Sequence, residues 1–299
     1  MLPLQFKTPT QKKNRIIQIE VTTRCDKTCS NCTRALAQVK KPDMTLEQFE
    51  QAVTASRDWI LRENGTLALF GGNPAISKNF IEYCRILAKY LPPKNRGLWC
   101  NNLLGKGSDA SKYFTRESMF NFNVHQDAQA AQEFREWFPY AQVFGEHAPS
   151  FHSSIFIASS DYLPEEVWRK KVQDCQYDTH WSAIIITEAP DWSKLGGYSC
   201  EIAATHARTN GQALGVEVVP GWLDLQRESF EEQYEYACRR CSGCLGVEGT
   251  VDLGPGMKDE VSRLNSNLVQ LTISKTRPVE VVDQITGGRD PIDYLRKKA

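Results

Sequence analysis

Short apolar runs alternate with stretches of helical apolar spacing along the first part of the chain. The runs are bounded by turn residues, as buried strands are, whereas the helical stretches gather apolar residues on one face. The predicted strands are Arg15–Val21, Thr66–Phe70 and Gly97–Cys100, and the predicted helices cover 46–62 and 78–90. Strand and helix alternating at this spacing predict parallel βαβ units and therefore an α/β fold.

A later segment, which ends at His125, alternates strictly between polar and apolar residues. Asn121, Asn123 and His125 share one face, while Phe122 and Val124 share the other. We expect the aromatic face to pack on helices and the polar face either to line a cavity or to be solvated. Beyond this segment the pattern predicts helices over 126–138, 164–174, 201–209 and 229–238, strands over 153–158 and 181–187, and a hairpin turn with a return strand over 196–200.

Composition narrows the class of protein. Lys and Arg number 36, as do Asp and Glu, so no global field favours nucleic acid or an anionic membrane. No apolar run approaches the roughly 18 residues that span a bilayer, and no signal-peptide apolar region follows the N-terminus. Ten cysteines without an export signal favour metal ligation in a reducing cytoplasm over disulfides.

Three of these cysteines, Cys25, Cys29 and Cys32, lie on one polar loop directly after the first predicted strand. A loop of this length can wrap three thiolates around one metal centre and leave a coordination position open for a reactant. Soft thiolate ligands select iron–sulfur clusters or zinc. The alternative is three reduced cysteines in an ordinary turn.

The cysteine loop resembles that of the radical S-adenosylmethionine (SAM) superfamily, a C-x3-C-x2-C sequence after the first strand of a partial (β/α)6 TIM-like barrel. The resemblance implies that Cys25, Cys29 and Cys32 hold a [4Fe–4S] cluster whose open iron chelates SAM. It also implies that an electron from the cluster cleaves SAM to methionine and a 5′-deoxyadenosyl radical. Asn31 stands where the family usually has an aromatic residue, which alters packing over the cluster without requiring a change in ligation.

Two further turns extend the resemblance. Gly71-Gly72-Asn73-Pro74 resembles the family's Gly-Gly-Glu-Pro motif, whose backbone contacts the methionine amino group of SAM. Asn73 keeps an acceptor oxygen but lacks the charge of the usual Glu. Cys100-Asn101-Asn102 resembles a Thr/Ser-Asn segment that touches the ribose and carboxylate of SAM. Taken by themselves, glycines at a strand's carboxyl end allow close approach of a ligand, but such a turn is also a simple strand exit.

Within such a barrel the polar face of the alternating strand would look into the lumen. Asn123 and His125 would then line the cavity for SAM or substrate, and we assign them catalytic roles. A neutral imidazole could hydrogen-bond SAM or substrate, or move a proton near neutral pH. The alternative is a strand with one solvated face.

A second cysteine set comprises Cys175, Cys200, Cys238, Cys241 and Cys244. Two cysteines spaced as Cys238 and Cys241 are typical of a metal site. The set resembles the SPASM/twitch extensions of radical SAM enzymes, which implies an auxiliary [4Fe–4S] cluster on four of the five thiols, with Cys244 the spare or the substitute. A structural zinc site and unligated thiols are the alternatives. Cys84 and Cys100 are singletons, which are more often core residues than ligands.

The predicted organisation is a lead-in over 1–14, a radical SAM core over 15–160, a cysteine-rich α+β extension over 161–250 and a tail over 251–299. The predicted function is hydrogen abstraction from a small-molecule, nucleotide, sugar or peptide substrate, with an external donor such as flavodoxin or ferredoxin supplying electrons. The alternatives are an electron-transfer or structural iron–sulfur protein and a radical SAM modifier of a peptide or protein.

Overall fold

The computed structural model describes residues 15–27, 32–36, 41–146, 183–225 and 227–238. The strands are β1 (Ile16–Glu20), β2 (Thr66–Phe70), β3 (Arg96–Cys100), β4 (Met119–Asn123), β5 (Val143–Phe144), β6 (Ile184–Glu188), β7 (Lys194–Tyr198) and β8 (Val216–Glu217). The helices are α1 (Leu46–Arg62), α2 (Phe80–Tyr90), α3 (Gly107–Ala110), α4 (Ala128–Trp137), α7 (Glu201–Thr209) and α8 (Glu231–Gln233). Shorter helical turns are η1 (Pro74–Ile76), η2 (Pro93–Asn95), η3 (Ser111–Tyr113), η5 (Trp222–Asp224), η6 (Arg227–Phe230) and the π-helical η7 (Tyr234–Cys238).

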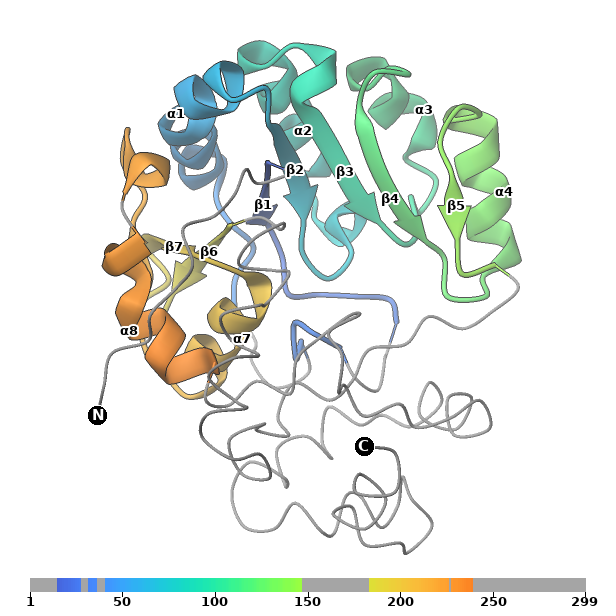
Figure 1. Cartoon of the computed structure of the whole chain (residues 1–299). Helices are drawn as coiled ribbons and strands as arrows, with labels where there is room; N and C mark the ends of the chain where they lie inside the picture. Colours follow the sequence, from blue (N-terminus) through green and yellow to red (C-terminus); the bar gives the residue numbers. More distant parts are fainter. Residues whose placement is uncertain (1–14, 28–31, 37–40, 147–182, 226, 239–299) are drawn as a thin grey trace, which may run out of the picture.

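The eight strands form one curved sheet in the order β5-β4-β3-β2-β1-β6-β7-β8 (Figure 1). Strands β1 to β6 pair in parallel, and β7 and β8 add to that sheet as antiparallel strands. The predicted α/β class with a mostly parallel sheet is thereby confirmed. The partial (β/α)6 barrel stays a prediction, and the proposed domain boundary at residue 160 lies outside the described residues.

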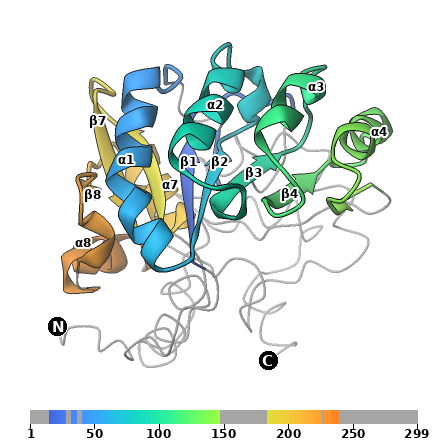
Figure 2. The same cartoon turned by 90° about the horizontal axis from the view of Figure 1, so that it is seen from above.

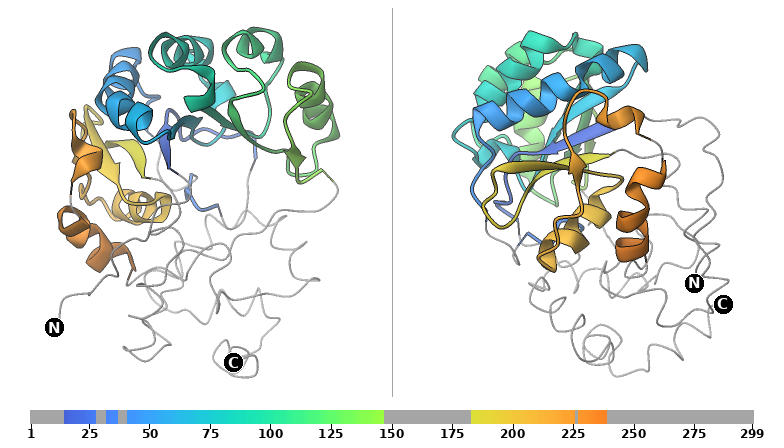
Figure 3. Two further views of the ribbon diagram at one scale, coloured as in Figure 1. Left: turned by 45° about the horizontal axis from the view of Figure 1, so that its top comes forward. Right: turned by 90° about the vertical axis from the view of Figure 1, so that its left-hand side faces the viewer.

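Helices cover both faces of the sheet. Helices α1 to α4 lie in a row over its outer face, as Figure 2 shows from above, and α7 lies on the opposite face beside β6 and β7 (Figure 3). Alternation along β6 serves both faces, because Ile185 joins the core under α1 while Ile184 and Ile186 join the smaller core under α7. None of the helices among the described residues is long and apolar enough to cross a membrane.

Local sequence explains several element boundaries. The Thr45 hydroxyl accepts from Gln48 N, and the Gln48 side chain accepts from Thr45 N, so the predicted capping box starts α1. The aromatic face of β4 packs on α4 as predicted, with Phe122 stacked on Phe134 at a ring-centroid distance of 4.0 Å. Asn121, on the other face, is exposed.

One prediction for the later elements was wrong. Gly196 and Gly197 lie within β7, not in a hairpin turn, and the turn between β6 and β7 covers 189–193. The glycines are needed for space, because a Cβ on Gly197 would lie 2.5 Å from the Trp222 ring and one on Gly196 would lie 2.4 Å from the Glu188 carboxyl carbon. The predicted helix over 229–238 is helical throughout, as the consecutive turns η6, α8 and η7 of different helix types. The elements predicted over 153–158 and 164–174 lie outside the described residues.

Candidate active site at the carboxyl edge of the sheet

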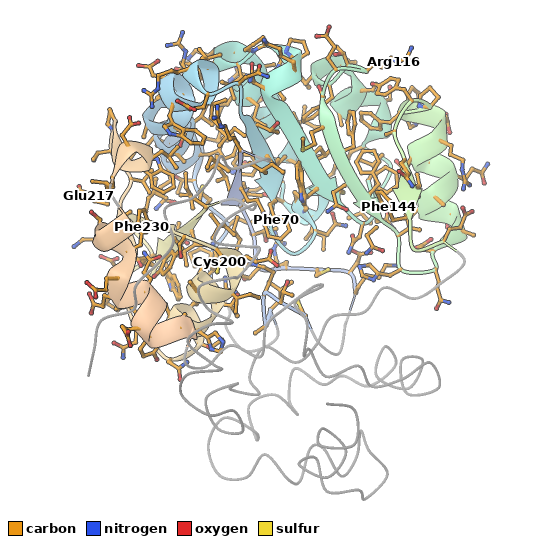
Figure 4. The ribbon with its side chains drawn as sticks, viewed as in Figure 1. Phe70, Arg116, Phe144, Cys200, Glu217 and Phe230 are labelled. Atoms are coloured by element: carbon orange, nitrogen blue, oxygen red, sulfur yellow. The ribbon has the colours of Figure 1, made fainter. Side chains whose placement is uncertain are left out.

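The cysteine loop leaves the carboxyl end of β1, in the interior of the sheet. Because β1 to β5 are parallel, their carboxyl ends meet at this edge, which Phe70 at the end of β2 and Phe144 at the end of β5 mark in Figure 4. In parallel α/β folds this is the edge where ligands bind. The loop therefore begins at the position in the fold where side chains from several strands can reach it.

The Gly71-Gly72-Asn73 turn is bound to the backbone of the cysteine loop. Gly72 N donates to Thr22 O at 2.9 Å, and Asn73 N donates to Arg24 O at 2.8 Å. A Cβ on Gly71 would lie 2.5 Å from Thr22 O, and one on Gly72 would lie 2.2 Å from Arg24 O. The glycines are thus required by the close approach of the cysteine loop, a reason that the sequence did not reveal.

Asn73 is fully buried and joins the cysteine loop to the end of β3. Its Nδ2 donates to Asp26 Oδ1 at 2.8 Å and to Asn102 O at 2.9 Å. Its Oδ1 accepts from Ala75 N and from the thiol of Cys100. The acceptor oxygen predicted at this position is therefore used within the protein.

The structure describes two thiols of the loop, Cys25 and Cys32. Cys25 Sγ accepts from Asn101 Nδ2 at 3.3 Å and from Lys27 N at 3.5 Å. Burial raises the pKa of Cys25 to about 11 and also raises the pKa of Cys32. Both cysteines are half-buried and free. Cys29 lies outside the described residues, and among those that are described no three His, Cys, Asp or Glu side chains are grouped as a metal site.

Lys27, inside the cysteine loop, is tied to the start of α4. Its Nζ lies 2.8 Å from Asp127 Oδ2 and 3.8 Å from Asp26 Oδ2. The other oxygen of Asp127 accepts from Ala130 N and caps α4. Asn102 Nδ2 also reaches Asp127 Oδ2, at 3.5 Å. One carboxylate thus connects the cysteine loop, the turn after β3 and α4.

His125 lies beside the cysteine loop but not on the strand. β4 ends at Asn123, and His125 has a left-handed φ of 49°, so the predicted alternation does not extend to it. The backbone N–H of His125 donates to Asn123 Oδ1 at 3.4 Å, in a turn that changes the direction of the chain. Burial, followed by the charge of Lys27, lowers the pKa of His125. The His125 ring therefore lies near the charges of Lys27 and Asp26, where its protonated form is disfavoured.

Cys100 is a core residue within the proposed SAM-binding segment. It is buried, burial raises its pKa, and its thiol donates to Asn102 O at 3.0 Å as well as to Asn73. Cys84 is likewise buried in the core under α2. Of the neighbouring asparagines, Asn101 contacts Cys25 of the cysteine loop, and Asn102 contacts Asp127, the N-cap of α4.

Within the second cysteine set, a side chain is described only at Cys200. This residue is the N-cap of α7, and its sulfur accepts from Ala203 N at 3.3 Å (Figure 4). The side chains of the other four members, Cys175, Cys238, Cys241 and Cys244, lie outside the described residues. Ligation by this set therefore stays a prediction.

Sequence reasoning missed a buried group of charges below the cysteine loop. Four charged residues, Glu20, Arg34, Lys41 and Arg208, are each at most 7% exposed. The three cations surround the Glu20 carboxylate. The available signal was Glu20 itself, because a charged residue in a strand that is buried on both faces needs a partner. Nothing in the spacing indicated which cations would supply it.

No protein-family model matches the chain, and no curated protein matches it. Among solved structures, BtrN in complex with AdoMet and 2-DOIA has a TM-score of 0.47 and 14% identity, over 80% of this chain and 95% of that one. A structure of BtrN in an open conformation has a TM-score of 0.46 and 13% identity, over 77% and 89%. Similarity at this level assigns neither a family nor an activity.

Proposed function

We propose that the chain is a radical SAM enzyme that binds a [4Fe–4S] cluster through Cys25, Cys29 and Cys32. The observation that carries the proposal is the placement of the cysteine loop at the carboxyl edge of the parallel sheet, with its backbone hydrogen-bonded to the Gly71-Gly72-Asn73 turn. The C-x3-C-x2-C spacing and this turn are the two motifs on which the resemblance to the superfamily rests. Their contact in the fold supports treating them as one site.

The described donor set fits such a cluster. Cys25 and Cys32 are soft sulfur ligands on one loop, and neither is in a disulfide. Asn101 Nδ2 and Lys27 N point at Cys25 Sγ, and N–H donors to ligand sulfur are the contacts that tune bound iron–sulfur clusters. When bound, the cluster would supply the electron that splits SAM into methionine and a 5′-deoxyadenosyl radical.

The chain's own residues hold this site in shape. The Asn73 side chain fixes Asp26 and Asn102, and the Lys27–Asp127 pair fixes the first half of the loop on α4. We assign SAM-binding roles to the backbone of Gly71–Pro74 and to the Cys100-Asn101-Asn102 segment. His125 and Asn123 are assigned to the substrate side, where a neutral imidazole can accept a proton or a hydrogen bond.

An auxiliary cluster on four of Cys175, Cys200, Cys238, Cys241 and Cys244 belongs to the same proposal. Its test is metal analysis of a Cys238→Ala/Cys241→Ala double variant. Iron should fall while the iron of the first loop remains. About one zinc per chain with unchanged iron would instead identify a structural zinc site.

The decisive test is production of 5′-deoxyadenosine by the anaerobically reconstituted, dithionite-reduced protein. Cys25→Ala and Cys32→Ala should each abolish it and remove only part of the iron. Cys84→Ala is the matched control, because it removes a buried thiol outside the loop. Wild-type protein that takes up iron but never yields 5′-deoxyadenosine would identify an electron-transfer or structural iron–sulfur protein.

A further inference from the structure

Four charged side chains are buried together at the end of β1, beneath the return of the cysteine loop. Glu20 is fully buried, and the side chains of Lys41, Arg208 and Arg34 are 0%, 1% and 3% exposed. Arg208 Nη1 donates to Glu20 Oε1 at 2.5 Å, and Lys41 Nζ lies 3.6 Å from the same oxygen. Arg34 Nε donates to Glu20 Oε2 at 2.9 Å, and Arg34 Nη2 reaches the same oxygen. We call these four residues the Glu20 cluster.

The remaining donors of the Glu20 cluster fix the chain after Cys32 to α7. Arg34 Nη1 donates to Glu201 O at 2.7 Å and to Thr205 Oγ1 at 3.1 Å. Arg208 Nη2 donates to Arg34 O, so the guanidinium groups of the cysteine loop and of α7 each hold the other segment. These contacts join residues that lie more than 160 positions apart.

At neutral pH the cluster carries three cations for one carboxylate, because burial lowers the pKa of Lys41 only to about 8. Burial by itself would raise the pKa of Glu20, but the charges of Arg208, Arg34 and Lys41 outweigh it and lower the pKa well below its ordinary value. Glu201 is also buried, and counting its carboxylate together with that of Glu20 still leaves one cation in excess. Arg208 Nε has no hydrogen-bond partner in the described part of the chain. Uncompensated charge in a protein interior is costly, so the surplus implies a further anion nearby.

Among the proposed metal ligands, Cys32 lies nearest to this surplus along the chain. Arg34 follows it by two positions, and charge on Cys32 acts on the pKa of Arg208. Three thiolates bring more negative charge than an oxidised [4Fe–4S] core brings positive charge, so the bound centre would be anionic. One-electron reduction would add a further negative charge beside the same cations.

We propose that the Glu20 cluster compensates the charge of the metal centre held by Cys32, and thereby favours its reduced state. This inference rests on the proposed function, since it requires an iron–sulfur cluster on the cysteine loop. Its consequence is that removal of one buried cation makes reduction harder, because the added electron loses a nearby positive charge. If the Glu20 cluster only held these segments together, loss of one cation would lower the free energy of unfolding without shifting the midpoint potential of the metal centre.

The test is the midpoint potential of the cysteine-loop cluster in the full-length reconstituted protein, followed by electron paramagnetic resonance during redox titration. The signal that belongs to this loop is the one that Cys32→Ala removes. Arg208→Gln and Lys41→Met each remove one cation, while Arg208→Lys keeps the charge. Arg62→Gln is the surface control, because Arg62 pairs with Asp224 where both side chains are 50% exposed. Iron content and thermal midpoint are measured alongside.

We expect the potential to shift to more negative values in Arg208→Gln and Lys41→Met, and to stay at the wild-type value in Arg208→Lys and Arg62→Gln. Lys41→Met keeps the apolar stem, so it provides the measurement if Arg208→Gln fails to fold. An iron-loaded Lys41→Met with the wild-type potential would overturn the inference and leave the proposed function standing. Wild-type protein without any signal dependent on Cys32 would refute the proposed function itself.

Discussion

At the scale of single residues, the Gly71-Gly72 pair is explained by the backbone of the cysteine loop, which passes close to both glycines. The carbonyl oxygens of Thr22 and Arg24 occupy the positions that a Cβ would take. A backbone oxygen cannot rotate away as a flexible side chain can. The pair therefore controls how closely the cysteine loop approaches the end of β2.

Gly72→Ala should displace the cysteine loop, because its Cβ would lie 2.2 Å from Arg24 O. We expect a loss of about 1–3 kcal/mol in the free energy of unfolding, as for other overpacked sites. Iron uptake should fall as well, since the Asn73 N to Arg24 O hydrogen bond is lost. Chemical denaturation and iron analysis measure both quantities.

Gly105→Ala is the control for this variant. Gly105 has a φ of +76°, and no atom lies within 4 Å of the position that a Cβ would take, so only backbone strain results. It should lose stability yet bind iron as the wild type does. Normal iron uptake by Gly72→Ala would show that the loop tolerates the displacement.

At the scale of elements, α4 begins on a residue with two partners. Asp127 caps the helix through Ala130 N and pairs with Lys27 of the cysteine loop. These contacts use different oxygens of one carboxylate, so substitution can separate them. The same carboxylate therefore connects the start of α4 to the cysteine loop.

Asp127→Ala should lower the free energy of unfolding by about 1 kcal/mol, the usual cost of a lost N-cap. Asp127→Asn should cost only a few tenths, because Asn is an equally good cap and a partly exposed ion pair contributes little. Denaturant titration of both variants checks this. Equal losses would mean that the Lys27 pair, not the cap, stabilises this end of α4.

At the scale of the whole molecule, the Glu20 cluster ties β1, the cysteine loop and α7 into one unit. Breaking such a group by removing one partner is far more costly than breaking a surface ion pair. The unit also makes stability depend on pH, because Glu20 has a lowered pKa in the folded state.

The free energy of unfolding should fall as the pH drops below about 4.5, the ordinary pKa of a glutamate. Below that value the unfolded chain binds a proton at Glu20 that the folded chain refuses, so acid favours unfolding. Above that pH the contribution of Glu20 to the free energy of unfolding is complete and does not depend on pH. Guanidinium titrations of the metal-free protein between pH 7 and pH 3 measure the slope.

Glu20→Gln provides the comparison. It should be less stable at neutral pH, since three buried cations lose their carboxylate, and its stability should fall less steeply in acid. An identical acid slope in wild type and Glu20→Gln would show that other carboxylates control the acid transition.

The sequence by itself determined several elements and the location of the cysteine loop. Periodicity and capping are local, so it predicted α1, β2 and α7 with the observed bounds and placed the cysteine loop at the end of β1. The alternation that ends at His125 correctly predicted the aromatic face of β4. It failed at His125, because β4 ends at Asn123 and the left-handed φ of His125 departs from the extended backbone on which alternation depends.

Only the tertiary structure decided which residues meet around that loop. Arg208 reaches Glu20 across 188 positions, because β6 joins the sheet beside β1 and brings α7 beneath the loop. Likewise, Thr22 and Arg24 explain the two glycines only once β2 pairs with β1. Such contacts depend on strand order, which hydrophobic periodicity does not encode, and so buried charge partners and backbone approaches were beyond reach of the sequence.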